Sequence, residues 1–371
     1  MICNNILSKL PTKHVWVFLT DKCNLNCDYC FFRYRSGNTD LSRKQIDSLL
    51  MFLPKDKKCN LVISGGEPLL VWDNVRYIFD NVDKLFTKKI FTIQSNMYYW
   101  QDSHIKYVLD RHIEVEPGLD GYFSTNKQHR LGLDESGYNI CLENVRKVVF
   151  KGIPIHPTMT VHPDEVYSMY DNFKYLINLG FYSWEVHPAF LMPWNRRESK
   201  IFLKEYKKIL LWELKQNRKG DRKIYLNKMY SHPIKYSFDL IVQPNGKILP
   251  NWTLLSFPEN IRERFVLFEL TNDGCIANRQ NLIWYLNKLK LFFSKYLNIS
   301  YRDFSNFNAA LAIKHMGKEI REGFEEYLWL TDKIKQMEIA VTDVLTQNCI
   351  AQILYRPSFD SASFKMWEQG K

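Results

Sequence analysis

Two features of membrane and secreted proteins are missing from this sequence of 371 residues. No apolar run approaches the roughly 20 residues that a helix needs to span a bilayer. The first residues, MICNNILSKLPTKH, lack the charged and then apolar layout of a secretory signal. We therefore expect a cytoplasmic protein. Its composition, 46% hydrophobic and 25% charged, is typical of a folded globular chain.

Cysteine is scarce as well, because eight cysteines in a chain of this length are too few for a disulfide scaffold. Three of them, Cys23, Cys27 and Cys30, lie together in the segment DKCNLNCDYCFF. In a reducing compartment they stay thiols, which are suitable ligands for zinc or for an iron-sulfur cluster. The other five are scattered: Cys3, Cys59, Cys141, Cys275 and Cys349.

The net charge of +11 favours an acidic partner, such as an acidic peptide or a nucleic acid. Much of the excess lies between Arg196 and Lys223, where lysines alternate with apolar residues at helical spacing. The simpler interpretation of this segment is a solvated face of a helix.

Strand-like and helix-like patterns alternate through the first half of the chain. The apolar runs, which we interpret as strands, are 14–20, 60–66, 89–96, 113–120, 153–160 and 183–190. The helical patterns between them include 41–53, 74–86, 139–150 and 166–180. Such alternation predicts an α/β fold with parallel strands. Six units are fewer than the eight of a closed barrel, so we expect a partial (β/α)6 barrel over residues 1–192.

The second half, residues 193–371, has a different pattern. Basic, aromatic-rich helical patterns at 201–215, 279–297 and 318–336 predict a mainly helical region. One hairpin-like run, 239–252, interrupts them, and its Asn245 and Gly246 suit a tight turn.

Alternate residues on the predicted strands indicate that one face of the sheet is polar. The polar positions are Gln94, Asn96, Glu114, Glu116, Gly118, His156, Thr158, Thr160, Glu185 and His187. The opposite positions are apolar, so helices should cover that face and leave the polar face lining a lumen. We consider Glu116, Glu185 and His187 as candidates for substrate binding or proton transfer, although a simple hydrogen-bonded network is the alternative.

The three clustered cysteines follow the first strand, at the edge of the sheet where α/β folds usually hold their sites. A structural zinc ion needs a fourth ligand, and the nearest, His14, is about 20 Å away along an extended strand. A [4Fe-4S] cluster held by three cysteines leaves one iron free to chelate a small molecule. The spacing therefore favours the cluster.

The segment TDKCNLNCDYCFF resembles the signature of the radical S-adenosylmethionine (radical SAM) superfamily, and SGGEPLL after the second strand resembles its second motif. The resemblance implies that a [4Fe-4S] cluster binds to Cys23, Cys27 and Cys30 and that S-adenosylmethionine (SAM) ligates its open iron. Gly65 and Gly66 would let the backbone approach the methionyl group, Glu67 would accept from its ammonium, and Pro68 lacks a competing N–H.

Further segments resemble the SPASM/twitch branch of that superfamily, and this resemblance covers about half of the chain. TIQSN, with Gln94 and Asn96, looks like the third-strand segment, although Met97 stands where a glycine is usual. GLDGYFSTNKQHR looks like the fourth-strand segment, with Gly118 in place of the usual serine. The resemblance implies that Asp120, Arg130 and Tyr29 contact SAM, with Arg130 on its carboxylate and Tyr29 on its adenine.

The auxiliary-cluster cysteines of that branch have no counterpart, because Asn251 stands where the first is expected. Downstream only Cys275 and Cys349 remain, which is too few for a second cluster. We therefore expect a single cluster and a redox-neutral or reductive outcome. Epimerisation would need a hydrogen donor, for which Cys141, Cys275 and Cys349 are candidates, with Cys275 chosen as the catalytic candidate.

The resemblance predicts an enzyme that abstracts hydrogen from a peptide or protein substrate, for example in epimerisation or cross-linking, with flavodoxin or ferredoxin as reductant. Only 22 residues precede Cys23, so we expect no separate N-terminal peptide-recognition domain. The alternatives are the same chemistry on a small metabolite and, in another class, a non-enzymatic metal protein that binds nucleic acid.

Overall fold

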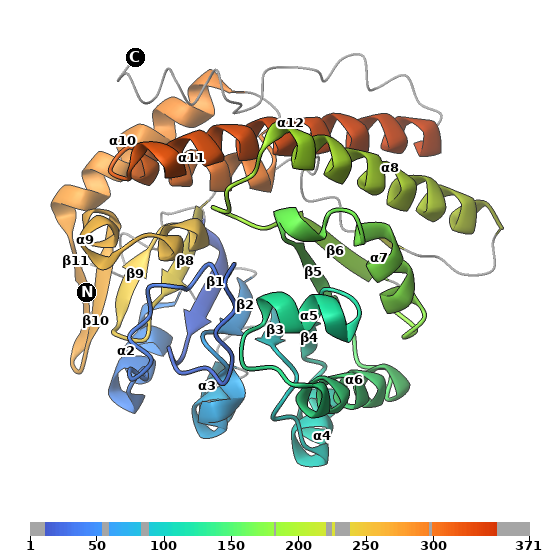
Figure 1. Ribbon diagram of the computed structural model, residues 1–371. Helices are drawn as coiled ribbons and strands as arrows, with labels where there is room; N and C mark the ends of the chain where they lie inside the picture. Colours follow the sequence, from blue (N-terminus) through green and yellow to red (C-terminus); the bar gives the residue numbers. More distant parts are fainter. Residues whose placement is uncertain are drawn as a thin grey trace.

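The computed structural model describes residues 12–53, 59–82, 89–181, 183–219, 225–226, 238–296 and 299–346. Its central feature is a curved wall of six parallel strands (Figure 1). The strands are β1 (Thr12–Phe18), β2 (Cys59–Ser64), β3 (Lys89–Ser95), β4 (Glu114–Pro117), β5 (Thr158–Val161) and β6 (Ser183–Pro188). Parallel bridges from Val115 to Ile155 and from Gly118 to Thr158 carry the wall from β4 to β5. The predicted partial barrel is confirmed.

Helices follow the strands along the chain and cover the outer side of the wall (Figure 1). They are α2 (Arg43–Phe52), α3 (Trp72–Val82), α4 (Asp102–Asp110), α5 (Phe123–His129), α6 (Glu135–Phe150) and α7 (Met169–Ile177). Alternate strand residues such as Ile93 and Val115 are fully buried on this side. Phe79 of α3, for instance, packs on Phe91 of β3 with ring centroids 5.1 Å apart. This confirms the apolar face that the alternation predicted.

Strands from the second half of the chain extend this wall at both edges. They are β7 (Tyr225–Leu226), β8 (Phe238–Val242), β9 (Lys247–Leu249), β10 (Phe268–Thr271) and β11 (Gly274–Ala277). β8 pairs in parallel with β1, β7 pairs in parallel with β6, and β9 to β11 continue antiparallel beyond β8. The predicted hairpin is present as β8 and β9, with Gly246 at φ +84° in its turn. Its junction with β1 was not predicted.

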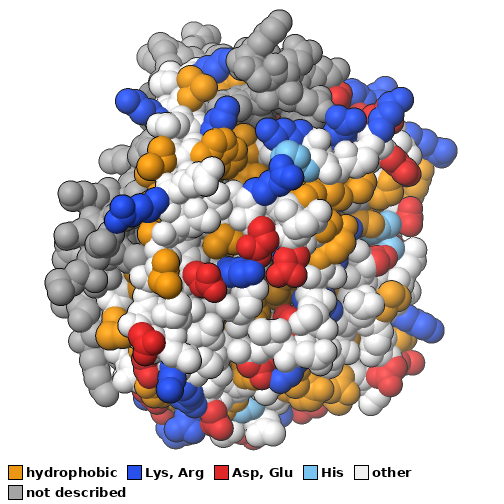
Figure 2. Space-filling model, turned by 90° about the vertical axis from the view of Figure 1, so that its left-hand side faces the viewer, with side chains coloured by type: hydrophobic (Ala, Val, Ile, Leu, Met, Phe, Trp, Pro, Cys, Tyr) orange, Lys and Arg blue, Asp and Glu red, His pale blue; other side chains and the backbone are white. Residues whose placement is uncertain are grey.

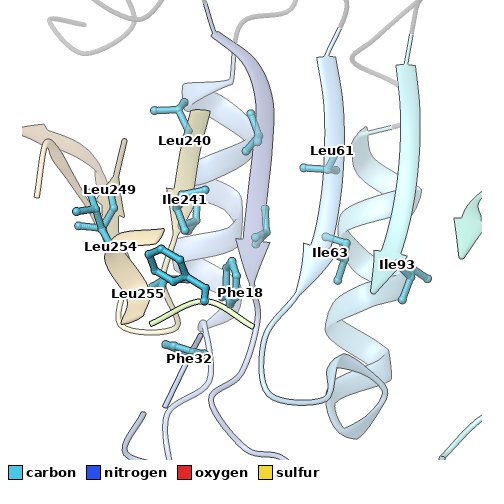
Figure 3. Close-up of a cluster of buried hydrophobic side chains, with 14 of the residues drawn as sticks. Phe18, Phe32, Leu61, Ile63, Ile93, Leu240, Ile241, Leu249, Leu254 and Leu255 are labelled. Atoms are coloured by element: carbon cyan, nitrogen blue, oxygen red, sulfur yellow. The ribbon is translucent and has the colours of Figure 1, made fainter. Parts of the chain in front are cut away.

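A buried apolar cluster holds the hairpin against the barrel (Figure 3). Phe18 at the end of β1 and Phe32 pack edge to face, with centroids 5.3 Å apart. Burying a side chain of this size contributes about 1.5–3 kcal/mol. The cluster also contains Leu61, Ile63, Ile93, Leu240, Ile241, Leu249, Leu254 and Leu255. The segment that carries the cysteines is therefore packed from both halves of the chain.

The remaining helices lie across one end of the wall (Figure 1). They are α8 (Arg196–Lys219), α9 (Glu259–Arg262), α10 (Arg279–Lys295), α11 (Tyr301–Ile313) and α12 (Lys318–Thr346), with α11 not predicted. Tyr206 of α8 donates to buried Glu338 of α12 at 2.7 Å, which ties these two helices together. No helix in the described ranges is long and apolar enough to cross a membrane.

On the face shown in Figure 2, basic side chains predominate in the upper part, and basic and acidic side chains are mixed in the centre and the lower part. Several basic side chains of the second half of the chain are paired. Lys247, for example, lies 2.5 Å from Glu263 and 3.7 Å from Glu259. On α8, Lys208 pairs with Glu205 at 2.6 Å, and Arg196 pairs with Glu326 at 3.0 Å. These pairs support the interpretation of the basic segment as a solvated helix face.

Candidate active site

Residues 19–42, which we call the cysteine loop, connect β1 to α2 and carry all three clustered thiols. Buried Asp21 closes the loop, since its carboxylate accepts from the backbone N–H groups of Ser36 at 3.1 Å and Thr39 at 2.7 Å. The N–H groups of Asn26 and Asp28 donate to the carbonyl oxygens of Leu131 and His129, which follow or end α5. Backbone bonds therefore fix the loop before any metal binds.

Cys23, Cys27 and Cys30 line one cavity of about 550 Å³. Burial raises the pKa of the Cys27 thiol to about 12 and also raises the pKa of Cys23, and in both cases the neighbouring thiols add to the rise. The charge of Arg130 partly lowers the pKa of Cys27 again, and Arg35 Nη1 lies 3.4 Å from Cys30 Sγ. These cations would stabilise thiolates, which a bound metal requires.

The arrangement of the three sulfur atoms bears on whether this site would hold a zinc ion or an iron-sulfur cluster. Among the described residues, a single group of three ligand atoms, from Asp28, His129 and His162, has all members within 4.8 Å of one another. The cysteine sulfurs are not such a group, whereas sulfurs around one zinc ion lie about 3.8 Å apart when each Zn–S bond is about 2.3 Å. Three thiols of one loop, flanked by arginines, fit an iron-sulfur cluster.

The glycine pair after β2 makes room for the cysteine loop itself. Gly65 has φ +145°, and a Cβ there would lie 2.5 Å from the carbonyl oxygen of Thr20. A Cβ on Gly66 would lie 2.0 Å from the carbonyl oxygen of Lys22. Both glycines line the cavity, and Gly66 N–H donates to Thr20 at 2.8 Å. The close approach thus brings the glycine segment beside the thiols.

Glu67 and Pro68 do not line the cavity. The carboxylate of Glu67 is fully buried and accepts from Leu69 N–H at 3.1 Å, Ser95 Oγ at 2.9 Å and Asn96 N–H at 2.8 Å. Glu67 therefore joins the loop after β2 to the end of β3. Pro68 opens a short 3₁₀ helix, Pro68–Val71, as proline suits a first helical position. Their placement gives no support to the predicted side-chain contacts with SAM.

The end of β3 places Gln94 and Asn96 in the cavity, as predicted from strand parity. Asn96 Nδ2 donates to Asn24 Oδ1 of the cysteine loop at 2.8 Å and lies 3.9 Å from Cys23 Sγ. Met97 has φ +69°, in the left-handed region that favours glycine. This backbone conformation explains why a glycine is usual at that position of the resembled family.

Arg130 lines the cavity, but its guanidinium is already paired. It donates to Asp120 through Nε at 2.8 Å and Nη2 at 3.2 Å, and Tyr29 Oη donates to the same carboxylate. Asp120 is buried outside the cavity lining and acts as the positioning residue of this trio. A Cβ on Gly118 would lie 2.9 Å from Arg130 Nη2, so the guanidinium occupies the space that the usual serine would need.

The lumen face is polar, as predicted. Glu114, Glu116, Thr158, Thr160, Glu185 and His187 all line the cavity. Burial raises the pKa of Glu116 to about 7 and that of Glu185 to about 8, and Glu116 adds to the rise at Glu185. Burial, together with nearby Arg302, lowers the pKa of His187 well below its ordinary value, so this imidazole is neutral.

Two residues of the second half of the chain complete the lumen and were not predicted. Arg302 of α11 donates through Nη2 to His187 Nδ1 at 3.2 Å, and its guanidinium lies 5.6 Å from the ring centroid of Trp252. Trp252 follows the β8–β9 hairpin and also lines the cavity. No local pattern marks Arg302 in the sequence. We call Glu116, Glu185, His187 and Arg302 the lumen cluster.

The described cysteines outside the cysteine loop do not line the cavity. Cys275 lies on β11, and β10, β9 and β8 separate that strand from β1. Cys141 is buried in α6, where burial raises its pKa to about 12. Neither is placed as a hydrogen donor to the cavity, and Cys349 lies outside the described residues.

Asn251 caps the 3₁₀ helix Trp252–Ser256 by accepting from Thr253 N–H at 3.0 Å.

Comparison with known proteins agrees with this geometry. The family model described as "Radical SAM superfamily" matches residues 17–176, which include β1 to β5 and all three clustered cysteines. This segment of the chain thus matches the radical SAM superfamily, as the sequence motifs indicated. The match supports an enzyme, and the superfamily implies an iron-sulfur cluster and SAM as cofactors.

Two curated relatives and one solved structure show the extent of the likeness. A cysteine-type anaerobic sulfatase-maturating enzyme of Clostridium novyi is 24% identical over 42% of this chain and 48% of its own length. The sporulation killing factor maturation protein SkfB of Bacillus subtilis is 24% identical over 44% of this chain and 39% of its own length. The chain thus spans less than half of the length of either relative.

The solved structure of native anSMEcpe with bound AdoMet covers 89% of this chain and 99% of its own, with a TM-score of 0.64 and 13% identity. A second structure of that protein contains AdoMet and the Cp18Cys peptide and has a TM-score of 0.62 over 90% of this chain at 13% identity. At this level of identity the likeness shows the fold, which extends beyond the radical SAM segment into the second half of the chain.

Proposed function

We propose that this radical SAM enzyme uses a single [4Fe-4S] cluster on Cys23, Cys27 and Cys30 to abstract hydrogen from a peptide or protein side chain. The observation that carries the proposal is one continuous cavity. It begins at the three thiols, passes the glycine segment and Arg130, and ends at the lumen cluster. A cofactor at the thiols and a substrate in the lumen would therefore share one enclosure.

The residues at the cysteine loop fit the cofactors in charge and shape. The reduced cluster would supply the electron that cleaves SAM to a 5'-deoxyadenosyl radical. Gly65, Gly66, Gln94 and Asn96 offer backbone and amide groups to SAM beside the thiols. Arg130, held by Asp120, keeps a cation at the cavity wall for a carboxylate. Tyr29 shares this anchor, so its ring is fixed against the same wall.

Support for a single cluster comes from the residues that follow the β8–β9 hairpin. The buried Asn251 side chain is used as a helix cap, and no other described cysteine lies nearby, since Cys275 is on the outer strand β11. Without a second cluster, a redox-neutral or reductive outcome is favoured. Epimerisation is less favoured, because Cys141 and Cys275 are not placed to return a hydrogen atom to the cavity. Cross-linking of the substrate is a net two-electron oxidation, so here it would need an external electron acceptor for the electron that a second cluster would otherwise take.

A peptide is favoured over a small metabolite as the substrate. Native anSMEcpe has been solved with a peptide bound, and SkfB is a maturation protein by name.

An acidic one-electron reductant such as flavodoxin or ferredoxin suits the outer surface of the cysteine loop. Lys22, Arg33 and Arg35 line a hollow of about 630 Å³ there, next to Cys23.

Anaerobic reconstitution followed by dithionite and SAM tests the proposal. We expect close to four irons per chain and release of 5'-deoxyadenosine, and the Cys27→Ala variant should lose both. The matched control, Cys275→Ala, should keep both, because Cys275 lies on β11 away from the cavity. Eight irons per chain would refute the single cluster, and stoichiometric zinc without cleavage of SAM would refute the cofactor assignment.

A further inference from the structure

The lumen contains two carboxylates that face the same enclosed space. Glu116 on β4 lies opposite Gln94 on β3, and Gln94 Nε2 donates to Glu116 Oε2 at 2.7 Å. Glu185 on β6 lines the same cavity, and its buried Oε1 has no hydrogen bond within the described part of the chain. Buried carboxylate oxygens normally have a partner, so this oxygen indicates that a group is to be supplied from the cavity.

The contacts of Arg302 do not supply that partner directly. Its Nη2 donates to His187 Nδ1 at 3.2 Å, which assigns the imidazole proton to Nε2. This Nε2 lies 3.6 Å from Glu185 Oε1, beyond hydrogen-bond length. The neutral imidazole therefore stands between the guanidinium and Glu185. Arg302 Nη1 donates to Tyr327 Oη at 3.3 Å, on the far side of the guanidinium.

The other charged groups around the lumen include both signs, since Arg302 and Arg35 line the cavity together with its carboxyl groups. Glu114 also lines the cavity, and its carboxylate is 3.7 Å from His156. Arg130 lines the cavity too, but its charge is offset by the bidentate pair with Asp120. The raised pKa values of Glu116 and Glu185 have burial as their largest cause, and the Glu116 charge adds to the shift at Glu185. A cation between the two carboxylates would remove this electrostatic cost.

Aromatic side chains provide an apolar surface in the same cavity. Phe31 and Phe190 both pack edge to face on Trp252, with ring centroids 5.4 Å and 5.7 Å from it. All three residues line the cavity. A carboxylate pair together with an aromatic surface suits a cationic group at the end of a hydrocarbon stem, because the stem packs on the rings and the cation reaches the carboxylates.

We propose that Glu116 and Glu185 form a subsite for a basic side chain of the substrate, such as the aliphatic ammonium of lysine. This rests on the proposed function, because it places the modified residue, or its neighbour, in the cavity that begins at the thiols. A hydroxyl-bearing group, as in a sugar, would fill the space but would not stabilise the ionised form of the two carboxyl groups. The subsite thus selects for charge as well as size.

Binding of a matched pair of small probes tests the subsite without knowledge of the full substrate. The reconstituted holoenzyme, saturated with SAM so that its amine site is filled, is titrated with n-pentylammonium and with 1-pentanol, a neutral analogue of the same length. Ligand-observed NMR gives both dissociation constants. We expect the ammonium to bind at least about tenfold more tightly, equivalent to about 1.4 kcal/mol.

The variants Glu116→Gln and Glu185→Gln should each reduce this preference, and the double variant should abolish it. Glutamine keeps the shape of the side chain, so folding is preserved. Glu269→Gln, on β10 outside the cavity, is the matched control and should keep the preference. Equal affinity of the wild-type enzyme for both probes would overturn the subsite, as would a preference that survives the double variant.

The two proposals fail separately in this design. Formation of 5'-deoxyadenosine by the same wild-type preparation is measured in parallel. If it is absent, the proposed function is overturned. If it is present while the probes show no charge preference, only the basic side-chain subsite is overturned.

Discussion

The two ends of the active-site cavity are built in different ways. At the cysteine loop, the ligands come from one segment of eight residues, and the glycine segment touches that loop through backbone contacts. The lumen cluster takes Glu116 from β4, Glu185 and His187 from β6, and Arg302 from α11. The comparison shows that the cofactor end is encoded locally, whereas the substrate end depends on elements that are far apart in the chain.

The largest expected effect concerns the buried ion pair at the cofactor end. Arg130→Met leaves the Asp120 carboxylate buried without its cation, which costs about 3–5 kcal/mol. Chemical denaturation under anaerobic conditions measures the loss. The double variant Arg130→Met/Asp120→Asn should recover a large part of the stability, because the uncompensated charge is removed. Full stability of the single variant would show that the pair does not fix this end of the cavity.

A pH titration sharpens the comparison at the substrate end. The folded-state pKa of Glu185, about 8, is above its ordinary value of 4.5, so its stabilising contribution is complete below about pH 4.5 and is lost as the pH rises through about 8. Between about pH 5 and pH 8, wild-type stability should fall relative to Glu185→Gln by up to about 1.4 kcal/mol per pH unit.

Thermal unfolding at several pH values measures this difference. The control Glu143→Gln alters an exposed carboxylate on α6 and should leave the slope unchanged. Parallel pH profiles for wild type and Glu185→Gln would contradict the burial of a neutral carboxyl in the lumen.

Adding one methyl group should disturb the cofactor end. The Cβ of Gly66→Ala would lie 2.0 Å from the backbone oxygen of Lys22, so the cysteine loop must shift. Overpacking of this kind costs about 1–3 kcal/mol. We expect lower stability and a lower iron content after reconstitution. Gly317→Ala is the control, because a Cβ there meets no atom within 4 Å. Equal iron content in both variants would argue against the loop contact as the determinant of the site.

The smallest effect is expected at Asn251. Asn251→Ala removes the cap of the 3₁₀ helix Trp252–Ser256, which costs about 1 kcal/mol. Iron content should stay the same, because this position caps a helix and holds no metal in our proposal. Iron analysis measures the cluster content, and a thermal melt measures the loss of stability. Loss of iron in this variant would place a metal site beside the β8–β9 hairpin.

Much of the site was visible in the sequence because it depends on local patterns. The cysteine spacing, the glycine pair and the alternation of polar residues on β3, β4, β5 and β6 identified the thiols and most of the lumen. Side-chain roles were less predictable. Glu67 and Asp120 were expected to contact the cofactor, and the structure shows them outside the cavity lining, where Glu67 anchors the β3 end and Asp120 anchors Arg130. Their hydrogen-bond partners come from the end of β3, from Arg130 after α5 and from Tyr29 of the cysteine loop, which spacing along one strand does not show.

The sequence by itself determined the radical SAM signature, the parallel barrel and the polar face, since these follow from residue spacing and from the two-residue period of a strand. Only the tertiary structure decided that β8 joins β1, that Cys275 lies on an outer strand, and that Arg302 and Trp252 complete the lumen. The physical reason is that these placements arise from burial of apolar surface between segments that are distant in the chain. No periodicity in the sequence predicts such contacts.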